Sequence, residues 1–267
     1  MMQFDVESWR IESRKHPFFG ENISLERYKQ VWDDAAENYD AAGVGPLRER
    51  ITDRLIETII TKDRSVIDIG CGPGTYSTSF AAHSRSVTCL DGSAPMLKRI
   101  EASRIENIRC VLADWEDYET DERFDIVFSS LCPALNNPEG ILKMESLSNG
   151  YCVYVSSMND DTGSIDRQIW KSLGKDYTYN GYNTNYPYRF LLEKGRTPTL
   201  EVFEDIQPFT KPFDEVMQRE IRSFSEYMDV DDRVRGLIET AVRDHSVGDD
   251  VQFEGRKRLG LLIWSVR

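Results

Sequence analysis

Apolar residues recur along this chain at two different spacings, which separate two kinds of region. In segments 25–32 and 46–60, apolar residues lie three and four positions apart, a spacing that predicts amphipathic helices. From residue 65 to about residue 157, short apolar runs typical of buried strands alternate with helical patterns. Strands that alternate with helices predict a parallel sheet covered on both faces, with ligands bound at the carboxyl ends of its strands.

The first strand ends in a glycine-rich turn. The apolar run 66–69 contains Asp68, and three glycines follow at alternate positions, starting at Gly70. Glycine has no Cβ, so such a turn can bend tightly and bring the backbone close to a ligand. The first amide groups of a helix that starts at residues 75–77 would point at the same ligand. Turns of this kind bind dinucleotides or S-adenosylmethionine (SAM), and the glycines alone do not distinguish the two.

Further segments follow in order. The next strand, 86–91, leads into Gly-Ser-Ala-Pro-Met-Leu at 92–97, the third strand, 108–112, leads into Asp114, and a fourth strand covers 124–130. Together with the glycine turn, these segments resemble the class I SAM-dependent methyltransferases. Motifs of that family include an acidic residue just before Gly-x-Gly-x-Gly, then Asp-x-Ser-x-x-Met-Leu, then an acidic residue after the third strand.

The resemblance implies that SAM is the cofactor and S-adenosylhomocysteine (SAH) the product. Asp91 would accept hydrogen bonds from the ribose hydroxyls, a role that it could also play for NAD. Asp114 would face the adenine amino group, and Asp68 would order the glycine turn and the cofactor's amino group. The predicted cofactor-binding residues are Tyr39, Asp68, Gly70, Cys71, Gly72, Gly74, Asp91, Gly92, Ser93, Met96, Asp114, Trp115 and Ser130.

Tyr39 belongs to a separate segment, 32–40, which is similar to the Trp-x-x-x-Ala-x-x-Tyr-Asp segment of many small-molecule methyltransferases. In that family the tyrosine helps to close the cofactor pocket. The alternative interpretation is an amphipathic helix in which Trp32 and Tyr39 only pack against the core.

The resemblance also implies a Rossmann-like α/β fold, whose seven-stranded, mostly parallel sheet has an antiparallel last strand. Residues 149–155 would form the fifth strand, 259–266 the antiparallel strand and 200–206 its hairpin partner. Inserted helices are expected at 212–227 and 231–244. We expect a single domain over 1–267, which consists of an N-terminal helical cap (1–61), a SAM-binding core (62–158), an acceptor-side lid with insertions (159–258) and a closing strand (259–267).

Composition narrows the classes of partner. The 267 residues are 40% hydrophobic, enough for a full core, and the formal net charge is -13. Nucleic acids attract basic patches, so an acidic chain without a Lys/Arg run is not expected to bind DNA. No apolar run of about 18 residues is present to span a membrane, and the first residues carry acids rather than a signal segment. We therefore expect a cytoplasmic protein. The five cysteines form no Cys-x-x-Cys pair, which favours reduced thiols and no metal site.

Methyl transfer from a sulfonium is an in-line displacement, for which the enzyme mainly aligns the reactants in a dry site. The catalytic residues therefore stay open. His16 is a candidate base, because N-terminal segments of the family fold over the acceptor pocket, and its alternative is a surface or packing histidine. Cys132 is a candidate nucleophile, because pyrimidine methyltransferases place a cysteine in this loop, and its alternatives are a structural thiol in the pocket or a core residue.

Segment 176–190 contains five tyrosines and is the expected acceptor-specific element. Aromatic faces would favour a flat or cationic acceptor, and the alternative is an ordered surface loop packed by its own tyrosines. We expect a small-molecule acceptor. A methyltransferase of a protein or RNA partner and a SAM-binding interaction subunit without turnover stay open. The sequence determines neither the acceptor atom nor the oligomeric state.

Overall fold

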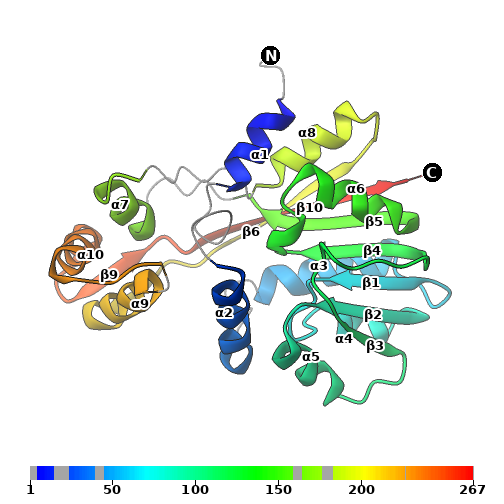
Figure 1. Ribbon diagram of the computed structural model, residues 1–267, viewed down its shortest axis with the longest axis horizontal. Coiled ribbons are helices and arrows are strands. Elements are labelled where there is room, and N and C mark those ends of the chain that lie inside the picture. The colour runs from blue at the N-terminus through cyan, green and yellow to red at the C-terminus, as the bar shows by residue number, and fades with distance from the viewer. Residues whose placement is uncertain are drawn as a thin grey trace.

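A seven-stranded sheet forms the centre of the molecule, in the order β3-β2-β1-β4-β5-β10-β6 (Figure 1). The computed structural model describes residues 5–14, 24–39, 45–158, 164–175, 183–225 and 227–266. The first five strands in this order, β3, β2, β1, β4 and β5, are parallel, and β10 is antiparallel to both β5 and β6. The strands are β1 (Ser65–Ile69), β2 (Ser86–Asp91), β3 (Ile108–Leu112), β4 (Phe124–Ser130), β5 (Ser148–Ser157), β6 (Thr199–Ile206) and β10 (Arg256–Ser265). The predicted Rossmann-like sheet and its antiparallel last strand are confirmed.

Burial on both faces explains why the inner strands are continuous apolar runs. All five residues of β1 are buried, including Asp68. The apolar side chains of β1 alternate between two clusters, with Val66 in one and Ile67 and Ile69 in the other. Because water is excluded from both sides, a parallel strand in this position needs no polar face.

Three helices cover the face to which Val66 contributes. They are α3 (Gly45–Thr58), α4 (Ser77–Ala81) and α5 (Ala94–Glu101). Ile51, Phe80 and Leu97 bring one side chain from each helix into the same apolar cluster. The predicted helix 46–60 therefore exists as α3, and its apolar spacing reflects packing on the sheet.

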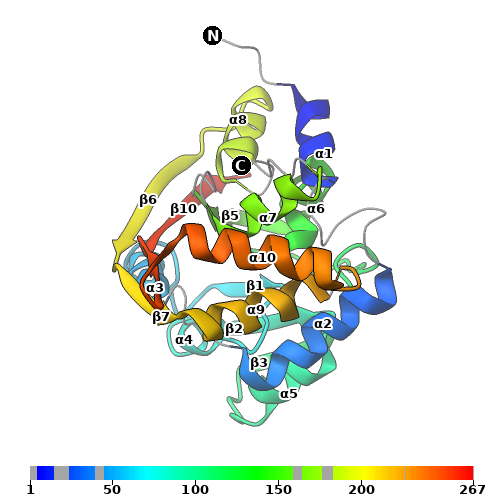
Figure 2. The ribbon, with the colours of Figure 1, turned by 90° about the vertical axis from the view of Figure 1, so that its left-hand side faces the viewer.

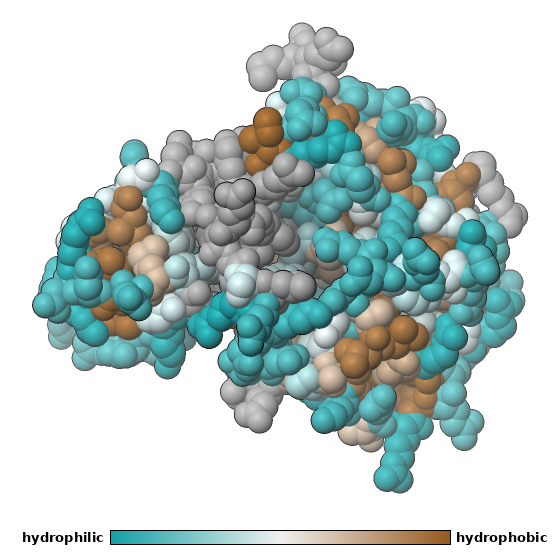
Figure 3. Space-filling model, viewed as in Figure 1, coloured by the Kyte–Doolittle hydropathy of each residue, from teal (hydrophilic) through white to brown (hydrophobic). Residues whose placement is uncertain are grey.

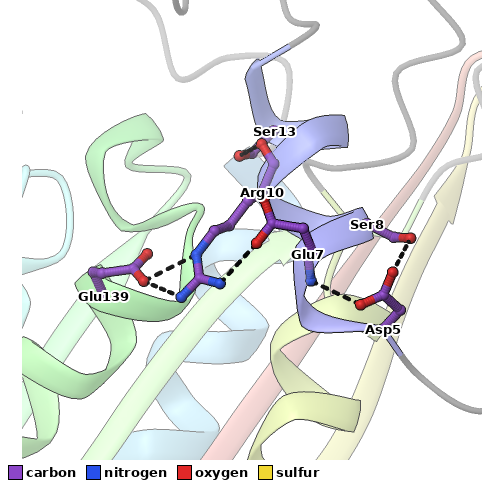
Figure 4. A network of polar contacts seen from close by, with 6 residues as sticks. All are labelled: Asp5, Glu7, Ser8, Arg10, Ser13 and Glu139. Atoms are coloured by element: carbon purple, nitrogen blue, oxygen red, sulfur yellow. Dashed lines mark hydrogen bonds and ion pairs between the residues drawn. The ribbon is translucent and has the colours of Figure 1, made fainter.

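The opposite face is covered by α1 (Val6–Arg14), α6 (Pro138–Ser146) and α8 (Asn185–Glu193). Trp9 is fully buried there, and its indole nitrogen donates to Asn136 Oδ1 at 3.4 Å. At the surface, the guanidinium of Arg10 pairs with Glu139 and so also joins α1 to α6 (Figure 4). Tyr186 of α8 stacks on Trp9 with ring centroids 6.2 Å apart, so this tyrosine of the 176–190 segment packs in the core. Residues 176–182 lie outside the described part of the chain.

A smaller unit lies beyond the end of the main sheet, at the left of Figure 1. It consists of α7 (Ile165–Ser172), α9 (Phe213–Ser225), α10 (Asp232–Asp244) and a sheet in the order β7-β9-β8. These strands are β7 (Phe209–Pro212), β8 (Ser246–Val247) and β9 (Asp250–Phe253). The unit has its own apolar cluster, and Figure 2 shows α9 and α10 side by side within it. The two inserted helices were predicted, whereas the small sheet was not.

A two-stranded ribbon joins the small sheet to the main sheet, since β6 continues into β7 and β9 into β10. Helix α7 of the same unit lies between β5 and α8 in the chain. Gly255 lies at the junction with a φ of 61°. A Cβ on Gly255 would lie 1.9 Å from the carbonyl oxygen of Gln207, so a side chain cannot be accommodated there without moving the backbone. Gln207 in turn donates its backbone N–H to the carbonyl of Gly255 at 3.2 Å.

The outer surface is mostly hydrophilic on the face shown in Figure 3, in keeping with the charged residues that make up 30% of the chain. Among the described residues, none of the helices combines the length and the apolar character needed to span a membrane.

We expect Gly255→Ala to lower the free energy of unfolding by more than about 1 kcal/mol, because the new Cβ adds a backbone clash to an unfavourable φ. Urea titration followed by circular dichroism measures the effect. Gly248→Ala is the control for φ alone, since Gly248 has a φ of 66° and open space around its Cα. Gly236→Ala, in the open interior of α10, should instead stabilise by about 1 kcal/mol. Equal losses in G255A and G248A would show that the contact with Gln207 is unimportant.

Candidate cofactor site

A cavity of about 450 Å³ opens at the carboxyl ends of β1, β2, β3 and β4. This is the edge at which open α/β sheets bind ligands, and the sequence places its motifs there. The lining residues are Tyr28, Lys29, Trp32, Tyr39, Ile69, Gly70, Gly72, Leu90, Asp91, Gly92, Ser93, Met96, Ala113, Asp114, Trp115, Glu116, Asp117, Ser130, Leu131, Cys132, Pro133 and Ala134.

The glycine turn forms one wall of the cavity. Gly70, Gly72 and Gly74 all have positive φ angles, which glycine adopts at low cost. A Cβ on Gly70 would lie 2.4 Å from the sulfur of Cys132, so only glycine lets the turn pack against the loop after β4. The turn is thereby fixed against two neighbouring strand ends.

Asp91 connects that turn to the next strand. Its Oδ2 accepts a hydrogen bond from the backbone N–H of Gly72 at 2.8 Å, and its Oδ1 accepts one from Ser93 at 2.9 Å. Burial raises the pKa of Asp91, and these backbone hydrogen bonds oppose that rise. The carboxylate therefore lies at the cavity wall, where the predicted ribose contact requires it.

Asp68 lies behind the cavity wall. It is buried and accepts a hydrogen bond from the Ser77 hydroxyl at the start of α4. Burial raises the pKa of Asp68 to about 7, and the Ser77 hydrogen bond opposes the rise. This hydrogen bond joins β1 to the start of α4, the helix that follows the glycine turn, and the predicted role of Asp68 in ordering that turn stays a prediction. Among the described residues, the predicted cofactor residues Asp68, Cys71 and Gly74 do not line the cavity.

At the other end of the cavity, Ser93 caps α5. Its hydroxyl accepts a hydrogen bond from the backbone N–H of Met96 at 3.4 Å and donates to Asp33 Oδ1 at 2.6 Å. Asp114 lies beside the residue before Ser93, since a Cβ on Gly92 would be 2.7 Å from Asp114 Oδ1. The predicted adenine-side residues are thus brought together, and Gly92 leaves room for the carboxylate.

Helix α2 (Leu25–Asn38) closes the cavity with residues that the sequence analysis did not assign to the cofactor. Tyr28 and Trp32 lie one turn apart, with ring centroids 6.2 Å apart in an edge-on arrangement. Lys29 Nζ contacts Asp114 Oδ2 at 2.7 Å. Tyr39, which was predicted, follows the helix and also lines the cavity. The sequence shows that residues 28 and 32 share one face of a helix, but it does not show that this face lies over the cavity.

Cys132 lines the cavity, but only 8% of it is exposed. Burial raises the pKa of the Cys132 thiol to about 12, with the charge of Asp91 adding to the rise. A thiol with such a pKa stays protonated at neutral pH, which disfavours the nucleophile hypothesis and favours a structural thiol. His16, the other candidate, lies outside the described residues.

Arg48 of α3 is a further cation near this cavity that the sequence analysis missed. Burial is the main cause that raises the pKa of Tyr39 and that of Tyr76, the latter to about 12, and the charge of Arg48 lowers both. The Tyr76 hydroxyl is buried and has no hydrogen-bond partner among the described residues. Arg48 therefore lies within electrostatic range of Tyr39, which lines the cavity. Within the described ranges, it forms no ion pair.

Comparison with known proteins agrees with this geometry. The family described as "Methyltransferase domain" matches residues 66–144. A ubiquinone biosynthesis O-methyltransferase from Nitrosomonas europaea is 34% identical over 167 residues, which cover 58% of this chain and 69% of that protein. A malonyl-[acyl-carrier protein] O-methyltransferase from Pseudescherichia vulneris is 28% identical over 192 residues, 68% of this chain and 72% of that protein. The N-methyltransferase NodS from Bradyrhizobium japonicum, solved with SAH, shares the fold with a TM-score of 0.52 and 14% identity over 89% of this chain and 97% of its own.

The chain belongs to the class I methyltransferases. It is a SAM-dependent methyltransferase, as its sequence motifs predicted, and SAM is its cofactor. The cavity fits that ligand, because a Cβ on Gly70 or Gly92 would close the space against Cys132 or Asp114. Asp91 at the carboxyl end of β2 and Asp114 just after the carboxyl end of β3 both line the cavity.

Asp68→Asn should flatten the pH dependence of stability between about pH 4 and pH 7. The folded carboxyl has a pKa of about 7 against an ordinary value of 3.8, so the folded state holds more protons in this interval. Stability contributed by the protonated carboxyl is full below pH 4 and is lost as the pH rises to 7, by up to about 1.4 kcal/mol per pH unit. Asparagine keeps the shape and can still accept the Ser77 hydrogen bond.

Urea titrations at pH 5 and pH 8 test this expectation. Asp53→Asn, on the exposed side of α3, is the matched control and should keep the wild-type difference between the two pH values. If D68N keeps that difference as well, Asp68 is already ionised in the folded protein at pH 5.

Proposed function

We propose that this methyltransferase transfers the methyl group of SAM to a small-molecule acceptor bound in the cavity under α2. The observation that carries the proposal is the cavity itself, which joins the glycine turn, Asp91 and Asp114 under a cover of aromatic side chains. A cavity of about 450 Å³ suits a small ligand. The names of the two curated relatives, which are O-methyltransferases, make an oxygen the first acceptor atom to test.

The cofactor residues divide along the length of the cavity. Asp91 accepts hydrogen bonds from the ribose hydroxyls, and Asp114 accepts one from the adenine amino group beside Met96 and Trp115. Tyr39 and Ser130 contact the methionine portion, and Tyr39 lies beside Gly72, where a Cβ would be 3.9 Å from its ring. The aligned strand ends fix these groups before the ligand arrives, so binding requires little reorganisation.

Bound SAM supplies an electrophilic methyl group on its sulfonium. The chain's own contribution is to orient that group, to hold the acceptor in line with it and to exclude water through Tyr28, Trp32 and Tyr39 of the α2 segment. Cys132 contributes packing against Gly70 rather than a nucleophile, because its buried thiol stays neutral.

Arg48 binds the carboxylate of the cofactor's methionine portion in this proposal. Its charge acts on Tyr39, which lines the cavity, and opposes the rise in pKa that burial causes there. A guanidinium without an ion pair among the described residues is available for a carboxylate. A carboxylate ligand would also offset the cost of holding a half-buried cation there.

The function is tested first by calorimetric titration with SAM, SAH and NADH. We expect the two adenosyl ligands to bind and NADH not to bind. Transfer of a labelled methyl group is then measured with phenols, carboxylic acids and amines as separate acceptor panels, with SAH production as a second readout. SAM binding with no transfer to any small acceptor would overturn the small-molecule proposal and favour a macromolecular acceptor or a subunit without turnover. A folded protein that binds neither SAM nor SAH would overturn the cofactor site.

Arg48→Met should weaken SAH binding by roughly 10- to 100-fold, the effect of about 1.5 to 3 kcal/mol expected for a hydrogen bond to a charged group. Binding of 5′-methylthioadenosine, which lacks the amino acid portion, should change little. Arg50→Met on the same helix is the control, since Arg50 donates to the backbone carbonyl of Glu204 at 3.0 Å instead. An equal loss for both ligands in R48M would show that Arg48 supports the fold and not the carboxylate.

A further inference from the structure

We propose that Lys29 is a positioning residue for the cofactor, because it holds Asp114 with one oxygen toward the cavity and fastens α2 over the cavity. The inference rests on the proposed role of Asp114 at the adenine. It assigns to α2 a function that neither the glycine turn nor the strand-end motifs provide.

The way α2 is attached is the first observation. None of its described side chains belongs to the three apolar clusters, although Ala36 is buried. The helix lies beside α5 (Figures 1 and 2) and is fastened to the cavity wall by polar contacts. Lys29 Nζ meets Asp114 Oδ2 at 2.7 Å, and the hydroxyl of Ser93 donates to Asp33 Oδ1 at 2.6 Å. An element held by few apolar contacts opens at low free-energy cost.

The arrangement at Asp114 is the second observation. Its Oδ2 is occupied by Lys29, whereas its Oδ1 lies against the bare Cα of Gly92, where a Cβ would be 2.7 Å away. Asp114, Gly92 and Lys29 all line the cavity. An ionised carboxylate offers about four lone-pair sites, so one group can hold an ammonium and accept a hydrogen bond from an amino group together. Lys29 thereby fixes the orientation of the carboxylate that the adenine meets.

The charges around α2 are the third observation. Asp33 of α2 faces the cavity wall and raises the pKa of Asp91, and Asp117 contributes to the raised pKa of Lys29 after Asp114 itself. Glu116 and Asp117 also line the cavity. An acidic helix that closes over an acidic cavity is repelled unless a cation lies between them. Lys29 is the cation from α2 that lines the cavity, so its charge permits closure.

Cofactor binding and closure of α2 are consequently coupled. The side chains of Lys29 and Asp114 are 45% and 34% exposed, and a pair with that exposure is weak on its own. An adenine beside Asp114 would displace water from the pair and strengthen it. By linkage, the ligand stabilises the closed helix to the same extent as the closed helix stabilises the ligand.

The test compares wild type, K29M, D114N and the double variant, with SAH as the ligand. We expect K29M to weaken SAH binding about threefold to tenfold, somewhat beyond the effect of an exposed ion pair. In the D114N background, K29M should have a clearly smaller effect than in wild type, because its partner carboxylate is gone and only the repulsion among the remaining carboxylates is left. K29R should restore most of the affinity. Lys171→Met, at an exposed position of α7, is the matched control and should bind as wild type.

Two further readouts separate positioning from a general structural role. Hydrogen exchange of the α2 amides should be faster in K29M without ligand, while α3 and α5 keep the wild-type rates. Added salt should weaken SAH binding in wild type by screening the ion pair, and should strengthen it in K29M by screening the remaining carboxylates. A structural defect would not reverse the sign of the salt effect.

An equal loss from K29M in the wild-type and D114N backgrounds would overturn the proposal, as would unchanged affinity and exchange. Failure of the wild-type protein to bind SAH would overturn the cofactor site instead. In that case, the ligand-free exchange of α2 would still report whether Lys29 fastens the helix.

Discussion

The carboxylate of Asp91 is the contact on which the cofactor site depends. It accepts one backbone N–H from the glycine turn after β1 and another from Ser93 at the start of α5, so a single side chain fixes two loops and one helix at neighbouring strand ends. Asp91 directs the amide of Gly72, whereas the amides of Gly70 and Cys71 donate to the backbone carbonyl of Leu90. Burial raises the pKa of Asp91, and the backbone hydrogen bonds oppose that rise by stabilising the ionised form. The carboxylate that would meet the ribose is thus the same group that holds the turn.

Much of the fold could be predicted from the sequence because its determinants are local. An apolar run such as β1, followed by a turn that needs positive φ, specifies a buried strand and its end with no knowledge of the partner strands. The small sheet was missed because its strands give little signal. β8 has two residues, and β7 ends in Pro212, a residue that is found mainly at sheet edges.

The sequence located cavity-lining residues where a motif lies directly at a strand end, as with Asp91 and Asp114, whose contacts with the cofactor stay predictions. Such residues were not predicted where tertiary packing brings in a distant helix. Lys29 and Arg48 are ordinary helical cations in the sequence, and only the placement of α2 and α3 shows what they face. Asp68 illustrates the reverse case. Its motif position was recognised, but the depth at which it lies behind the cavity wall is a property of the folded chain.

The unit formed by α7, α9, α10 and the small sheet has its own apolar core, and its small sheet joins the main sheet through a ribbon that contains Gly255. None of the described residues of that core lines the cavity, so changes among them leave the side chains that face the cofactor in place. Because the unit satisfies its own apolar packing, its sequence can vary apart from that of the cofactor site. The junction glycine is the residue there with the least freedom to vary.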